Sequence, residues 1–138
     1  MNITDITDED EKKPLVGQTA DPYVYFHKDG YYYFTYSCPE YDRIEIRRAW
    51  SVKGLDEARP LTVWRKHADG PMSWHIWAPE LHYIDSKWYL YFAAGRAEDP
   101  WWIRTWVLEN TSQDPFCGEW VEKQLDHHDR HIAESGHA

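Results

Sequence analysis

The chain has 138 residues with 15 basic and 24 acidic side chains, and its net charge of −9 disfavours a nucleic-acid partner, whose phosphates ask for a basic face. Its length suits one domain with an adequate core, and no stretch approaches the ~18 continuous apolar residues of a membrane helix, so no membrane partner is expected. Aromatic residues make up 17%, including nine Trp and ten Tyr, a composition that favours half-buried strands and also suits stacking on sugars.

Residues 1–14 are polar and charged, and they are expected to form a flexible lead. They contain no apolar core of a signal peptide. The sequence as it stands therefore predicts a cytoplasmic protein, with an extracellular location open if the native gene differs at its start.

Two stretches of the chain follow the same plan. Residues 20–37 run Asp-Pro, alternating apolar residues, a Lys-Asp-Gly turn and an aromatic strand, and residues 78–94 repeat this with Asp-Ser-Lys at the turn. The offset is 57 residues, both from Pro22 to Pro79 and from Tyr32 to Tyr89. A repeat of this length built from short strands indicates the blade of a β-propeller.

Further strand patterns complete each unit. Residues 43–52 and 61–67 follow the first hairpin, and residues 102–109 and 119–125 follow the second. We therefore predict an all-β protein with two four-stranded antiparallel blades, one over 15–67 and the other over 68–125. Two unrelated hairpins of a β-sandwich are the alternative.

Two blades are too few for a closed ring, which takes four to eight. The chain is expected to be a piece of a larger protein, or to assemble from several copies. Open blade faces would expose apolar strand surface and so allow self-association.

Residues 126–138 match neither blade and are expected to be disordered. They hold four of the eight histidines, so a metal-binding tail is the alternative, but no neighbouring groups would hold the ligands. Cys38 and Cys117 fit no disulfide framework or zinc pattern and are expected to be free thiols. No metal and no cofactor is predicted.

Asp21 is the first candidate site residue. It precedes Pro22 at the start of the innermost strand of blade one, and in a propeller that strand lines the central channel. A carboxylate there would point toward a ligand on the axis. The alternative is a turn residue before proline.

The second unit places an aromatic and acidic group at the equivalent position. Trp74, His75, Trp77 and Glu80 combine stacking rings with polar and acidic groups, which suggests a sugar pocket. Alternatively, Glu80 is a surface strand residue and His75 a hydrogen-bonded structural imidazole. Carboxylates at the start of both inner strands strengthen the first interpretation.

These motifs resemble glycoside hydrolase family 43, and its arabinofuranosidase-type members in particular. The resemblance rests on ADPYVYFHKDGYYYFTYS, IWAPELHYIDSKWYLYFAA and the segments 41–45 and 64–67, and it covers roughly residues 14–124. It implies a five-bladed β-propeller with its active site at the central channel. The implied activity is hydrolysis of α-L-arabinofuranosides or β-D-xylosides, as in plant polysaccharide breakdown, with inversion at the anomeric carbon.

Three carboxylates serve the family: a general base Asp in blade one, an Asp in blade three that tunes the acid, and a general acid Glu in blade four. By resemblance Asp21 is the base, while Trp77 and Glu80 fall at a pocket-lining position. The tuning Asp is not recognisable after Gln124, where the family pattern ends. The resemblance therefore implies a truncated chain that binds an arabinose- or xylose-containing oligosaccharide but is inactive alone. The alternative is a non-catalytic carbohydrate-binding or self-assembling half-propeller.

Overall fold

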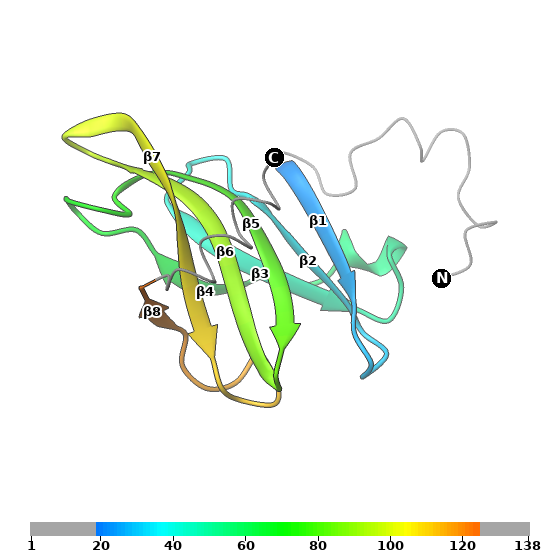
Figure 1. The fold of residues 1–138 in the computed structure, drawn as a ribbon. Coiled ribbons are helices and arrows are strands. Elements are labelled where there is room, and N and C mark those ends of the chain that lie inside the picture. The colour runs from blue at the N-terminus through cyan, green and yellow to red at the C-terminus, as the bar shows by residue number, and fades with distance from the viewer. Residues whose placement is uncertain (1–18, 125–138) are drawn as a thin grey trace.

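A computed structural model describes residues 19–124, and the regular secondary structure of this part of the chain is almost entirely β-strand (Figure 1). Eight strands and one 3-10 turn follow in chain order: β1 (Ala20–Phe26), β2 (Tyr32–Ser37), β3 (Arg43–Ala49), η2 (Lys53–Leu55), β4 (Leu61–Arg65), β5 (Trp74–Ile84), β6 (Lys87–Arg96), β7 (Asp99–Asn110) and β8 (Val121–Lys123).

The strands form two separate antiparallel sheets, one in the order β1-β2-β3-β4 and the other in the order β5-β6-β7-β8. Each sheet is thus a meander in which sequence neighbours pair, as in a propeller blade. A sandwich built from unrelated hairpins would not require this matched pair of four-stranded units. The prediction of two four-stranded antiparallel blades is confirmed.

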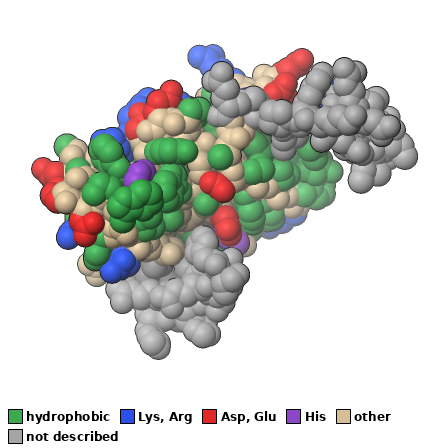
Figure 2. Space-filling view, turned by 90° about the horizontal axis from the view of Figure 1, so that it is seen from above, with side chains coloured by type: hydrophobic (Ala, Val, Ile, Leu, Met, Phe, Trp, Pro, Cys, Tyr) green, Lys and Arg blue, Asp and Glu red, His purple; other side chains and the backbone are tan. Residues whose placement is uncertain are grey.

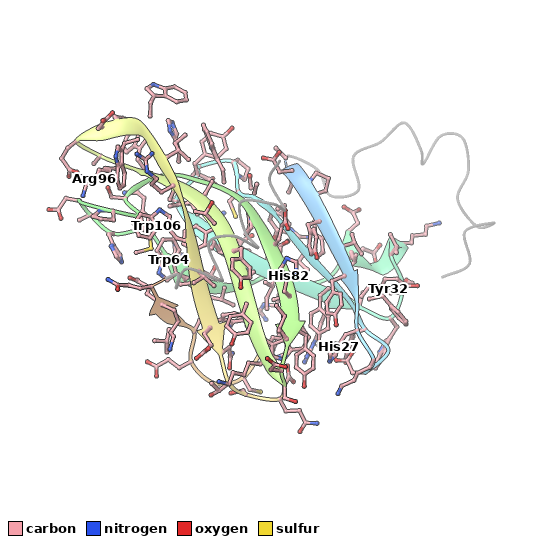
Figure 3. The ribbon with its side chains drawn as sticks, viewed as in Figure 1. His27, Tyr32, Trp64, His82, Arg96 and Trp106 are labelled. Carbon is pink, nitrogen blue, oxygen red and sulfur yellow. The ribbon has the colours of Figure 1, made fainter. Side chains whose placement is uncertain are left out.

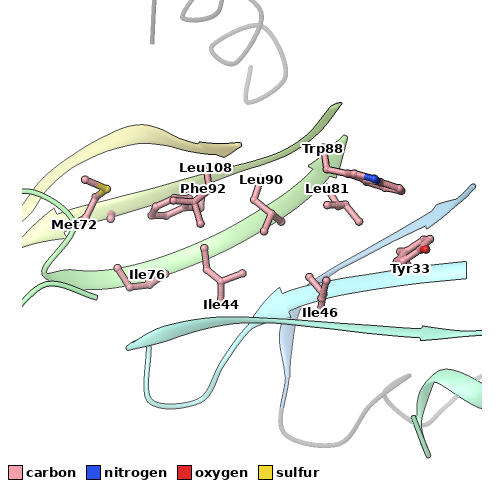
Figure 4. Close-up of a cluster of buried hydrophobic side chains, with 11 residues drawn as sticks. Tyr33, Ile44, Ile46, Met72, Ile76, Leu81, Trp88, Leu90, Phe92 and Leu108 are labelled. Carbon is pink, nitrogen blue, oxygen red and sulfur yellow. The ribbon is translucent and has the colours of Figure 1, made fainter. Parts of the chain in front are cut away.

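The core lies between the two sheets (Figure 4). From blade one, β2 and β3 contribute Tyr33, Ile44 and Ile46, and the period of two between the isoleucines puts both on the face toward blade two. Blade two contributes alternate residues of β6 to this core, in particular Trp88 and Leu90. Neither sheet buries this surface by itself, so the blades stabilise each other.

Charged side chains form contacts between the two blades beside the core. The Arg48 guanidinium lies over the rings of Tyr31 and Phe116, at 4.6 and 4.1 Å, and pairs with Asp114 across the interface at 2.7 Å. At the outer strands, the Glu122 carboxylate accepts from Trp64 Nε1 at 3.0 Å and lies 2.7 Å from His67 Nε2. These contacts hold the two sheets at a fixed relative position.

The internal repeat needs one correction. The first strands do follow the 57-residue offset, since Tyr23 pairs with Thr35 where Glu80 pairs with Tyr91. The second strands are instead offset by 56, from Thr35 to Tyr91. The physical reason is the turn: six positions separate the paired residues Phe26 and Tyr32, but five separate Tyr83 and Trp88.

The lead over 1–14 and the tail over 126–138 lie outside the described residues, so both expectations stay predictions, as do the boundaries at 15–67 and 68–125. Both cysteines are free thiols, as expected, with Cys38 buried and Cys117 exposed. Among residues 19–124 no helix is long and apolar enough to cross a membrane.

Candidate functional site at the start of the inner strands

Strands β1 and β5 begin at the same end of the molecule, the upper end in Figure 1. Asp21 lies here, exposed, where the pairing of β1 with β2 shifts register between Ala20 and Tyr23. Its φ is 53°, in the left-handed region that few non-glycine residues occupy. Such a bulge re-aims a side chain away from the ordinary alternation of a strand.

Blade two has the same irregularity at the equivalent position. Ala78, 57 residues after Asp21, has a φ of 51° and also precedes a proline, and the register of β5 shifts between Trp77 and Glu80. A residue before proline ordinarily avoids the helical regions. Because the same unusual left-handed conformation occurs at the start of both inner strands, it is a consistent feature of the fold.

A buried serine joins the two strand starts. The hydroxyl of Ser37, at the end of β2, donates to Asp21 Oδ2 at 2.8 Å and accepts from the backbone N–H of Ala78 at 2.8 Å. The neighbouring Thr35 hydroxyl donates to the Pro79 carbonyl oxygen at 2.6 Å. The Asp21 carboxylate is thus held at the junction between the two blades.

Glu80 follows on β5 and makes separate contacts. Its Oε1 lies 3.3 Å from His82 Nε2, and the His82 ring lies 5.8 Å from that of Tyr23 on β1 (Figure 3). Burial, and then the nearby Glu80 charge, raise the pKa of Tyr23 above its usual value. Glu80 therefore belongs to the contact between the inner strands.

The other three predicted residues form an aromatic cluster at the start of β5. The His75 ring stacks on Trp77 with centroids 4.4 Å apart and planes at 19°, and Trp74 lies 5.8 Å from the same imidazole. Tyr41 packs edge-on against Trp77 at 5.7 Å, and Trp101 lies 5.0 Å from His75. Viewed from this end, Figure 2 shows hydrophobic side chains gathered around a histidine on its left side.

The structure brings Trp74 and Trp77 each into contact with His75, and it joins Asp21 to this cluster through Ser37 and Ala78. Glu80 lies three residues after Trp77 on β5, and the roles of all five stay predictions. Reasoning from the sequence missed Ser37 and Trp101. The hairpin register could have revealed Ser37, because it pairs with Ala20, next to the candidate aspartate.

Comparison with known proteins gives one consistent result. The family "Glycosyl hydrolases family 43" matches residues 12–131. An "Extracellular exo-alpha-(1->5)-L-arabinofuranosidase" of Streptomyces chartreusis is 57% identical over 112 residues, which are 81% of this chain and 34% of the relative. A protein of the same name from Streptomyces avermitilis is 56% identical over 110 residues, 80% of this chain and 23% of the relative.

Among solved structures, the alpha-L-arabinofuranosidase from Lactobacillus brevis matches with a TM-score of 0.78 and 46% identity, over 91% of this chain and 40% of that one. The two sheets described here are accordingly two blades of a five-bladed propeller. The chain spans about a quarter to a third of the length of the two Streptomyces relatives, 23% and 34%.

Proposed function

Because the chain belongs to glycosyl hydrolases family 43, we propose that it contributes two blades to an enzyme that hydrolyses α-L-arabinofuranosides, with Asp21 as the general base. The observation that carries this proposal is the Ser37 hydroxyl, which bonds both the Asp21 carboxylate and the Ala78 backbone. An exposed carboxylate fixed at a blade junction can face a sugar at the channel.

In an inverting reaction the base takes a proton from the water that attacks the anomeric carbon, while an acid roughly 6.5–9.5 Å away protonates the leaving oxygen. Ser37 donates to Oδ2 of Asp21, which fixes the rotamer and directs the carboxylate. Positioning of this kind is what general base catalysis requires. The resemblance places the acid and its tuning aspartate in later blades.

The aromatic cluster supplies the apolar wall of the pocket. The rings of Trp77 and Trp74 offer faces for the C–H side of a pentose, and His75 between them offers a polar ring nitrogen. The substrate class is an oligosaccharide of arabinofuranose, the sugar in the names of the Streptomyces relatives. β-D-Xylosides are the alternative substrate.

Those relatives also bear on location. Both have "extracellular" in their names, and nothing supports the cytoplasmic expectation. We propose that the protein acts outside the cell, where arabinose polymers of plant material are encountered. Self-association through blade faces stays a prediction.

The test is a hybrid enzyme in which this chain replaces the 112-residue segment that it matches in the S. chartreusis relative. The hybrid is expected to hydrolyse an aryl α-L-arabinofuranoside. Asp21→Asn should lower kcat by about 10²–10⁴-fold or more, since the amide cannot accept the proton. A polypeptide of the 138 residues alone should show no turnover.

The matched control is Asp85→Asn, an exposed aspartate in the turn between β5 and β6 that also has a positive φ, 52°. It should leave kcat unchanged. An Asp21→Asn hybrid that keeps most of its kcat would contradict the general-base role. A folded hybrid that binds arabinose without any turnover would favour the non-catalytic, sugar-binding alternative.

A further inference from the structure

We infer that Trp101 forms a second sugar-binding position, which holds the pentose residue next to the one at Asp21. This inference rests on the proposed function, and it assigns a task to a residue on β7, in the hairpin with β6. The side chain of Trp101 is the most exposed large hydrophobic group of the described chain, at 73%. An indole this exposed contributes little to the core.

Contacts around its base fix where this indole lies. Its ring centroid is 5.0 Å from that of His75 and 6.1 Å from that of Trp77. The carbonyl oxygen of the preceding residue, Pro100, lies 3.2 Å from His75 Nδ1, which donates to it in the Nδ1–H tautomer. The hairpin is also closed tightly, because a Cβ on Gly95 would collide with the Pro100 carbonyl oxygen.

The rings form a path that leads away from the carboxylate. Trp77 directly precedes Ala78, whose N–H donates to Ser37, which in turn donates to Asp21. From Trp77 the next ring is His75 at 4.4 Å, and the next after it is Trp101. A pentose bound at Asp21 therefore has the face of Trp101 beyond it, where the next pentose of the oligosaccharide would lie.

The size of the exposed surface favours a sugar over a protein. Stable protein partners bury about 800 Å² on each side, with some 20–30 residues in contact. Here two exposed indoles, Trp74 and Trp101, flank one imidazole. An aromatic face that is fixed by its neighbours, with a polar nitrogen beside it, matches one neutral pentose ring. Because this face is rigid, the entropic cost of binding is lower.

The experiment is titration of the 138-residue chain with arabinose and with α-1,5-linked arabinotriose, followed by the indole N–H resonances in NMR. Arabinotriose should shift the Trp101 resonance, which Trp101→Phe identifies, whereas arabinose should shift the resonance of Trp77 but not that of Trp101. Trp101→Ala should weaken arabinotriose binding by about tenfold and leave arabinose binding unchanged.

Trp50→Ala is the matched control, since Trp50 is 65% exposed and stacks on Tyr31 at the other end of the β1–β2 hairpin. It should change neither affinity. Equal arabinotriose affinity in the parent chain and Trp101→Ala, or no response to arabinotriose at all, would overturn the inference. If arabinose still shifts the Trp77 resonance in that case, the proposed function stands without this inference. If neither sugar shifts any indole resonance, the result would count against the pocket itself.

Discussion

At the scale of single residues, His27 illustrates how the aromatic composition is used. It directly follows β1 at the turn, is 4% exposed, and lies with its ring 4.5 Å from Trp88 and 4.6 Å from Tyr83 (Figure 3). Its Nδ1 is 2.8 Å from the Tyr25 hydroxyl. Burial lowers the pKa of His27 below 6.5, because the enclosure favours the neutral imidazole.

This gives the stability of the protein a defined pH dependence. The unfolded chain binds a proton at His27 near pH 6.5, whereas the folded chain binds it only at lower pH. The contribution of the neutral ring is therefore fully present above pH 6.5 and is lost as the pH falls through the lowered pKa. Urea unfolding at several pH values should show this loss, and His27→Gln should flatten it. His82→Gln, a partly exposed histidine, is the control; an unchanged pH profile in His27→Gln would contradict the assignment.

At the scale of elements, the β6–β7 hairpin depends on one glycine. A Cβ at Gly95 would overlap the Pro100 carbonyl oxygen, so Gly95→Ala must open the hairpin. We expect a loss of about 1–3 kcal/mol in the free energy of unfolding, typical of overpacking. Urea denaturation followed by tryptophan fluorescence measures it.

The comparison variant is Gly70→Ala. The Gly70 site has open space around it but a φ of +72°, so alanine there causes no steric overlap and costs only the left-handed backbone penalty, about 1–2 kcal/mol. Gly95→Ala should therefore cost more than Gly70→Ala. The reverse order would mean that the hairpin relaxes freely around position 95.

The elements also show how far the sequence could lead. Alternating residues such as Ile44 and Ile46, turn signals and the internal repeat were enough to predict eight strands in two blades. The contacts at the site could not be predicted in this way, since the hydrogen bond from Ala78 to Ser37 joins residues 41 apart and depends on a bulge at Ala78. A pattern of period two carries no information about where a strand breaks that period.

At the scale of the whole molecule, the two blades share one core and should unfold together. Trp88 of blade two is fully buried and packs 5.2 Å from Tyr33 of blade one. Trp88→Ala should cost about 3–5 kcal/mol of unfolding free energy. Because neither sheet buries this surface alone, the loss should reach blade one as well.

Cys38 offers a probe of that spread. It lies in blade one with its thiol buried, and burial raises the pKa of this thiol to about 12, so it should be unreactive in the native state. Reaction with a thiol reagent should be limited to Cys117 in the parent chain and should extend to Cys38 in Trp88→Ala. Trp50→Ala, which removes an exposed indole, is the control. Continued protection of Cys38 in Trp88→Ala would show that blade one is independently stable.

The unequal turns of the two hairpins have a consequence for anyone who would recombine the blades as modules. An exchange that follows the visible 57-residue repeat would carry Tyr33 into the place of Leu90, although Tyr89 occupies its structural position. Every side chain of the second strand would then change faces. A working exchange must remove one residue from the transplanted turn, so the exchangeable unit of this protein is defined by strand pairing rather than by sequence alignment.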